Sequence, residues 1–138
     1  MGRIVLISCA SKKLPHRAKA QELYISPLFR LSLKYAHSLK PNNIFILSAK
    51  HGLVELNEEL DSYNETLMTK SNKETRLWAE DVSKELRLRV NLEQDEIVFL
   101  AGEKYRRHLI PHCKQHEVPL EGLRIGEQLQ FLQRKLSR

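Results

Sequence analysis

The sequence has no long apolar run and few cysteines, and each absence narrows the class of protein. None of its hydrophobic stretches approaches the ~18 residues that a membrane-spanning helix needs, so we expect no membrane partner. Its two cysteines, Cys9 and Cys113, are too few for a disulfide framework. We therefore expect free thiols in a reducing cytoplasm, and the absence of a signal-peptide pattern before Ile4 agrees with that location.

Glycine is also scarce, with 5 residues among 138, and the sequence contains neither a P-loop nor a dinucleotide-binding glycine triplet. A metal centre is not expected. His108, His112, Cys113 and His116 lie close together, but they lack the second ligand pair of a closed zinc site. Pro111 interrupts the helix that would align His108 with His112. The sequence therefore predicts no metal and no cofactor.

Positive charge is concentrated in the first third of the chain. Residues 1–54 contain nine Lys or Arg residues and one acidic residue, whereas residues 55–100 contain six Lys or Arg residues and twelve acidic residues. Residues 101–138 contain eight Lys or Arg residues and four acidic residues, and the formal net charge of the whole chain is +6. A basic segment favours a phosphate, nucleotide or nucleic acid as partner. A solvated basic face without a specific partner would explain the same charge.

Three short apolar segments predict a buried, mainly parallel sheet. Residues 4–7, 44–47 and 97–100 show no polar alternation, which is typical of strands buried on both faces. A fourth, short strand is expected at Val118. Helical patterns cover residues 26–40, 71–90, 103–110 and 125–136. We therefore predict a single α/β domain over residues 1–138, a three-layer α/β/α sandwich whose four-stranded, mainly parallel sheet has the strand order 2-1-3-4.

Two of these helices carry explicit start signals. Ser26 is followed by Pro27, which predicts an N-cap and then proline at the first helical position. Ser71 and Glu74 have the spacing of a capping box. Trp78 and the leucines of the helical patterns are expected in the core.

Polar residues follow the first predicted strand at once. Ser8, Cys9, Ser11, Lys12 and Lys13 lie just past its carboxyl end, where ligands bind in open α/β sheets. Two lysines beside a thiol favour the thiolate, so Cys9 is a candidate nucleophile. A small buried hydrophobic residue is the alternative for Cys9, because most free cysteines have that role.

The second predicted strand also ends in polar residues. Ser48, Lys50, His51 and Gly52 follow it directly. His51 is suited to general acid or base catalysis, and Lys50 to holding a phosphate or a developing oxyanion. Gly52 permits a positive φ angle or a close ligand approach. An exposed strand-to-loop turn is the alternative.

A long acidic segment, residues 53–70, is predicted to be an irregular loop, and loops of this length are often functional. Asp61 and Tyr63 alternate, so in an extended segment both would point toward the cationic cluster. Asp61 would then pair with a lysine or orient His51, and Tyr63 would contact a base. Alternatively, Asp61 caps a turn and Tyr63 packs the loop down. Two residues after the third strand complete the predicted ligand-binding set: Gly102 and Tyr105.

Several of these pieces together resemble a family of small bacterial proteins of unknown function. The matching pieces are the strand ending in Cys9, the Lys12-Lys13 pair, and residues 20–29, 46–53, 61–67 and 118–126. That family is distantly similar to the YaaA peroxide-stress proteins, through Leu47-Ser48, Gly52-Leu53 and Tyr63. It also resembles a domain of archaeosine synthase with a Cys-Ser-x-x-Lys-Pro motif, although Ala10 follows the cysteine here. Both groups are similar to the uracil-DNA glycosylase fold, which implies a nucleobase or nucleic acid ligand.

The leading interpretation is therefore an enzyme acting on a nucleobase, nucleotide or nucleic acid, by glycosyl transfer or hydrolysis. Lys12, Lys13 and Lys50 would neutralise phosphate, His51 would move a proton, and Cys9 would be the nucleophile or a wall of the site. Two other classes remain open. A non-catalytic nucleic-acid-binding protein would spread its basic side chains along a track, and a small regulatory interaction domain would leave the polar strand ends uncovered.

Overall fold

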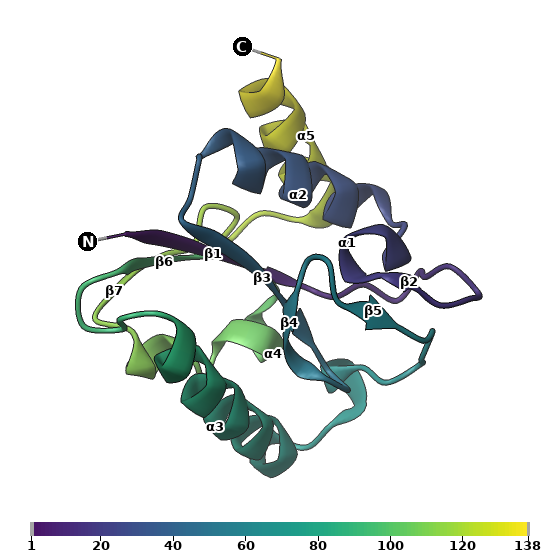
Figure 1. The fold of residues 1–138 in the computed structure, drawn as a ribbon. Coiled ribbons are helices and arrows are strands. Elements are labelled where there is room, and N and C mark those ends of the chain that lie inside the picture. The colour runs from purple at the N-terminus through teal and green to yellow at the C-terminus, as the bar shows by residue number, and fades with distance from the viewer. Residues whose placement is uncertain (1, 138) are drawn as a thin grey trace.

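The computed structural model describes residues 2–137 and contains a mixed five-stranded sheet (Figure 1). Its central strand is β1 (Arg3–Ser8), which lies between β3 (Asn43–Ser48) and β6 (Glu96–Leu100) and is parallel to both. At one edge β4 (Gly52–Glu55) pairs antiparallel with β3, and at the other β7 (Gln115–Glu117) pairs parallel with β6. The strand order is β4-β3-β1-β6-β7.

The α/β class is confirmed, but the predicted four-stranded sheet with the order 2-1-3-4 is not matched, because the sheet has a fifth, antiparallel strand, β4, at its edge. The other four strands are parallel neighbours in the order β3-β1-β6-β7. The additional strand β4 arises because the chain reverses at Gly52, whose φ angle is +74°. Leu53 and Val54 then pair with Leu47 and Ile46 of β3. The last strand also lies just before Val118 rather than at it.

The segment predicted as one irregular loop contains further regular structure. Within it, β5 (Glu59–Leu60) pairs antiparallel with β2 (Ala18–Lys19) in a separate two-stranded sheet. The short helix α1 (Ala20–Leu23) follows β2, and the 3₁₀ helix η1 (Leu67–Thr69) ends the segment. The polar link after β1 and the acidic segment after β4 are thus tied to each other, which places both beside the carboxyl end of the main sheet.

The two predicted helix starts are confirmed. In α2 (Pro27–Ser38) the Ser26 Oγ accepts a hydrogen bond from the Phe29 backbone N–H at 3.2 Å. In α3 (Asn72–Arg89) Ser71 and Glu74 form a reciprocal capping box, with both bonds at 3.1 Å.

The later helices differ more from the prediction. Helix α5 (Ile125–Leu136) has the predicted bounds, but α4 (Glu103–Arg106) is much shorter than residues 103–110. A separate 3₁₀ helix, η2 (Ile110–His112), surrounds Pro111, which lacks the N–H that a longer α-helix would need. Across residues 2–137, no helix combines the length and the apolar character that crossing a membrane requires.

Helices cover both faces of the sheet (Figure 1). Val5 and Ile7 of β1 pack on the side of α2 and α5, whereas Ile4 and Leu6 pack on the side of α3. Each of these four side chains is at most 2% exposed, and burying one stabilises the fold by about 1.5–3 kcal/mol. The chain leaves β1 toward β3 on one side and later reaches β6 on the other, so β1 and β6 form the topological switch point.

Candidate functional site

Cys9 is the first residue after the central strand, and it lies where several segments meet. Its backbone N–H donates to the Leu47 carbonyl oxygen of β3 at 2.9 Å. Its half-buried thiol donates to the hydroxyl oxygen of Tyr105 in α4 at 3.4 Å. The same oxygen accepts the Leu67 backbone N–H at 3.3 Å. Tyr105 therefore joins the ends of β1 and β6 to the segment around η1.

Three buried hydroxyl groups form a second cluster at the end of β3. The Tyr63 hydroxyl lies 2.5 Å from the Tyr24 hydroxyl and 2.8 Å from the Ser48 Oγ. The Ser48 Oγ also accepts the backbone N–H of His51 at 3.0 Å. Burial raises the pKa of Tyr24 to about 12 and raises the pKa of Tyr63 well above its ordinary value. These groups are thus neutral near pH 7 and act as hydrogen-bonding anchors.

Lys13 is the cation that lies closest to this hydroxyl cluster. Its ammonium is 4.5 Å from the centroid of the Tyr63 ring and 5.7 Å from that of Tyr24. Burial lowers the pKa of Lys13, and the nearby Cys9 opposes this shift. Lys12 and Lys50, in contrast, have exposed side chains. The predicted lysine cluster therefore has one half-buried member and two on the surface.

A hollow of about 410 Å³ lies beside Cys9. Cys9, Ser11, Lys13 and Tyr105 line one part of it. The rest is formed by the segment before and within η1, with Asn64, Glu65, Thr66 and Met68. Its lining thus combines a thiol, hydroxyl groups, an ammonium and the exposed Met68 side chain, and its volume falls in the range of small-molecule sites.

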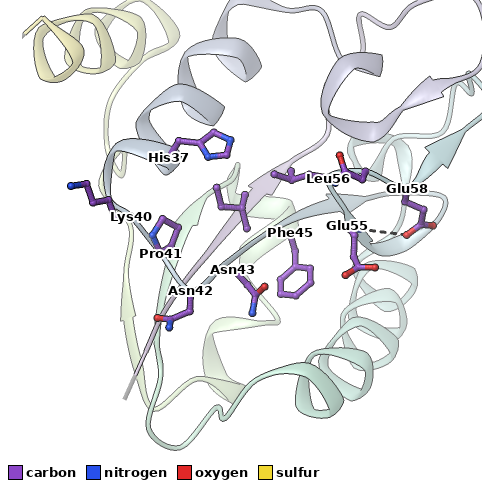
Figure 2. Close-up of a pocket in the computed structure, with 11 residues that line it drawn as sticks. His37, Lys40, Pro41, Asn42, Asn43, Phe45, Glu55, Leu56 and Glu58 are labelled. Atoms are coloured by element: carbon purple, nitrogen blue, oxygen red, sulfur yellow. Dashed lines mark hydrogen bonds between the residues drawn. The ribbon is translucent and has the colours of Figure 1, made fainter.

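A larger hollow, about 620 Å³, lies elsewhere, at the amino-terminal end of β3 (Figure 2). His37, Lys40, Asn43 and Glu55 are among the residues that line it, and Glu55 is paired with Arg89. None of the described residues around this hollow carries a thiol or a hydroxyl group. Because chemistry and not volume defines a reactive site, the smaller hollow beside Cys9 is the stronger candidate.

The structure corrects the expected position of Asp61. Its carboxylate is exposed and lies 3.3 Å from the guanidinium of Arg17, rather than pairing with the lysines or with His51. Tyr63, two residues later, is only 7% exposed. The two side chains point to different environments because residues 61–66 are irregular and not an extended strand. Tyr63 packs this segment onto the end of β3.

The remaining predicted residues are divided between turns and the sheet edge. The exposed ring of His51 packs edge-on against Tyr63, with the ring centroids 5.4 Å apart. Gly52 provides the positive φ that the turn into β4 requires. Gly102 is the N-cap residue of α4, and a Cβ there would meet nothing within 4 Å. Ser8 lines a second, smaller hollow between β1 and β6.

The sequence did not indicate the roles of two residues in this region. Tyr24 belongs to the hydroxyl cluster, yet it lies 39 residues from Tyr63, and no local pattern indicates their contact. Trp78 packs against the core, as predicted, and its Nε1–H also donates to the Ser48 backbone carbonyl at 2.9 Å. Trp78 therefore supports the end of β3 from the α3 side, while Tyr63 supports it from the other side.

Comparison with curated proteins and with solved structures gives no match for this chain. A family model, in contrast, matches residues 4–134. That match covers every strand except for Arg3 at the start of β1, nearly all of α5, and all residues around Cys9. The chain therefore belongs to the family that this model describes, a family of unknown function (DUF6884).

Proposed function

We propose that this chain is an enzyme that acts on a nucleobase, nucleotide or nucleic acid at the carboxyl-terminal edge of its sheet. The observation that carries the proposal is the hollow beside Cys9, where a thiol, the Tyr105 hydroxyl and the Lys13 ammonium meet at the end of the central strand. The similarity of the motifs to YaaA proteins and to the archaeosine synthase domain supports a nucleobase as part of the ligand.

The Tyr105 hydroxyl is the best-placed hydrogen-bond donor to a base. Its oxygen accepts from the Cys9 thiol and from the Leu67 N–H, so its own O–H remains to donate, either to the Thr66 hydroxyl or to a ligand in the hollow that both residues line. Burial and the neighbouring Cys9 raise the pKa of Tyr105 to about 12. The hydroxyl is therefore protonated near pH 7 and can donate to a ring nitrogen or to an exocyclic oxygen.

The reaction class that we propose is cleavage of an N-glycosidic bond, by transfer or hydrolysis. In hydrolysis the water oxygen bonds to the sugar C1′, the C1′–N bond breaks, and a proton goes to the departing base. Tyr105 would polarise the base and Lys13 would neutralise negative charge on the ligand. Cys9 would contact the sugar as wall or nucleophile, and His51, exposed at the same edge, would exchange the proton with solvent.

A binding and product assay tests this proposal. Nucleobases, nucleosides, nucleotides and short single- and double-stranded oligonucleotides would be screened by thermal shift at two salt concentrations, and the release of free base measured by chromatography. We expect at least one base-containing compound to raise the Tm, and Lys13→Ala and Tyr105→Phe to abolish the increase. Cys113→Ser serves as the control for Cys9→Ser, because Cys113 is buried away from the hollow.

The same screen identifies the rival class. Oligonucleotide binding that falls steeply with salt, tolerates Cys9→Ser and Tyr105→Phe, and releases no base would favour a non-catalytic nucleic-acid-binding protein. Absence of any base-containing ligand would reject the proposal.

A further inference from the structure

A second hollow, of about 90 Å³, lies between the carboxyl ends of β1 and β6. Ser8 and Ala101 line it at the strand ends, and the first turns of α2 and Gln128 of α5 also line it. This is the topological switch point, where open α/β sheets place phosphate-bearing ligands. Cys9 and Ala10 line this hollow as well as the larger one, so the two hollows lie on either side of these two residues.

Arg106 brings a cation with unused donors to this hollow. Its half-buried guanidinium donates one hydrogen bond, from Nη1 to the Ala101 carbonyl at 2.7 Å. Within residues 2–137 no carboxylate forms an ion pair with it, because the nearby Glu103 pairs with Arg107 at 2.6 Å. A guanidinium has five N–H donors in a planar fork, so most of those of Arg106 remain for another partner.

Ser32 brings a hydroxyl group that lacks a partner. The residue is only 3% exposed, and its Oγ makes no hydrogen bond in the described part of the chain. Within residues 2–137, every side-chain oxygen or nitrogen that is sealed from solvent has a hydrogen-bond partner. The Ser32 hydroxyl has no such partner, so it is not sealed and must reach an open space. The hollow that Ser32 lines is that space. The Ser32 hydroxyl is therefore available to donate to a ligand in this hollow.

Two neighbouring groups add to the same polarity. The Leu28 N–H, at the second position of α2, has no intrahelical acceptor, and the positive end of the helix dipole lies there. The Phe29 N–H is already used by Ser26. Gln128 donates its Nε2–H to the Leu123 carbonyl at 2.9 Å, which leaves its Oε1 as an acceptor.

We propose that this hollow binds the phosphate group of a nucleotide whose base occupies the larger hollow beside Cys9. The position of the base in this inference rests on the proposed function. The phosphate site itself does not. The Arg106 fork and the Ser32 hydroxyl donate to phosphate oxygens, and the Gln128 oxygen accepts the P–OH of a monoanionic phosphate. Because the two hollows lie on either side of Cys9 and Ala10, the sugar of one mononucleotide would cross the end of β1.

The test follows inorganic phosphate by NMR of the backbone amides of the full chain. Titration of the wild type is expected to shift the amides of Leu28, Ala101 and Gly102. Arg106→Gln should weaken the phosphate affinity by about 10- to 100-fold, and Ser32→Ala by about 3- to 10-fold. Arg107→Gln is the matched control, since it removes the adjacent arginine, whose partner Glu103 lies outside the hollow; it should change the affinity less than about twofold.

Ser32→Ala keeps the test decisive if Arg106→Gln unfolds the α4 turn. Equal losses in Arg106→Gln and Arg107→Gln would overturn the inference. So would the absence of phosphate shifts in the wild type, or shifts confined to other segments. A panel of nucleosides and their 5′-monophosphates then separates the two proposals. Nucleosides that bind as tightly as their monophosphates would reject the phosphate site alone. Phosphate binding here with no base-dependent shift at Cys9 would reject the proposed function alone.

Discussion

The Tyr63 hydroxyl and the Ser48 Oγ, 15 residues apart in sequence, lie 2.8 Å from each other beneath the surface. This bond ties the acidic segment to the end of β3. Because Ser48 also accepts the His51 N–H, the position of the His51 turn depends on the same hydroxyl group. The two strand-end clusters around Cys9 and Ser48 are thus held by tyrosines from distant parts of the chain.

Replacing Tyr63 with phenylalanine should lower the free energy of unfolding by about 1–3 kcal/mol, because it leaves Ser48 and Tyr24 without their common partner. Urea denaturation measures the change. Tyr35→Phe is the control. Tyr35 is buried to a similar extent, with 9% of its surface exposed, but its hydroxyl makes no side-chain hydrogen bond within residues 2–137. Equal effects of the two substitutions would show that the hydroxyl cluster does not stabilise the fold.

The buried tyrosines predict a loss of stability at alkaline pH. The pKa of Tyr24 is about 12 in the folded protein, against about 10 in the unfolded chain. Above pH 10 the unfolded chain releases this proton and the folded protein keeps it, so stability falls as pH rises toward 12. The contribution of Tyr24 is at most about 3 kcal/mol. Denaturation at several pH values should show a steeper decline for the wild type than for Tyr24→Phe, and parallel curves would contradict this assignment.

The two cysteines should react differently with iodoacetamide. Burial raises the pKa of Cys113 to about 11, and the side chain is only 9% exposed, so its thiol is expected to stay unmodified in the folded protein. Cys9 lines both hollows and should be alkylated first. Mass spectrometry of native and denatured samples measures the order. Faster modification of Cys113 would mean that Cys9 is not accessible from the proposed site.

Gly52→Ala should destabilise the protein by about 1 kcal/mol. The reason is the φ angle of +74° and not crowding, because an added Cβ would meet its nearest neighbour, Val82, at an ordinary 3.6 Å. Gly126→Ala is the matched control in the first turn of α5, where an added Cβ meets nothing within 4 Å. It should be neutral or stabilise by up to about 1 kcal/mol. Thermal denaturation of both variants would show whether the turn after His51 depends on glycine.

Asp61→Asn should leave ligand binding unchanged and alter the free energy of unfolding by less than about 1 kcal/mol, because its ion pair with Arg17 is exposed to solvent. Binding of the compounds found in the screen, measured by thermal shift, checks this. A clear loss of affinity would return Asp61 to the site and would require residues 61–66 to rearrange around the ligand.

The sequence by itself determined the elements whose signals are local. The apolar runs at 4–7, 44–47 and 97–100 are buried strands, because they are short and rich in β-branched and aromatic residues, which suits a strand buried on both faces. The caps at Ser26 and Ser71 are read from side chains that bond within three residues. For Gly52 the residue type permitted a positive φ or a close ligand approach, and the structure shows the positive φ.

Tertiary structure alone decided which distant groups meet. The strand β4 depends on the chain reversing at Gly52 onto β3, and its four residues are too few for a periodic pattern to stand out. Asp61 and Tyr63 have the spacing of alternate residues in a strand, yet residues 61–66 form no strand and the two side chains lie in different environments. The contacts of Tyr105 with Cys9 and of Tyr63 with Tyr24 span 96 and 39 residues. Sequence spacing cannot encode such contacts, because they arise only when the strands are ordered in the sheet.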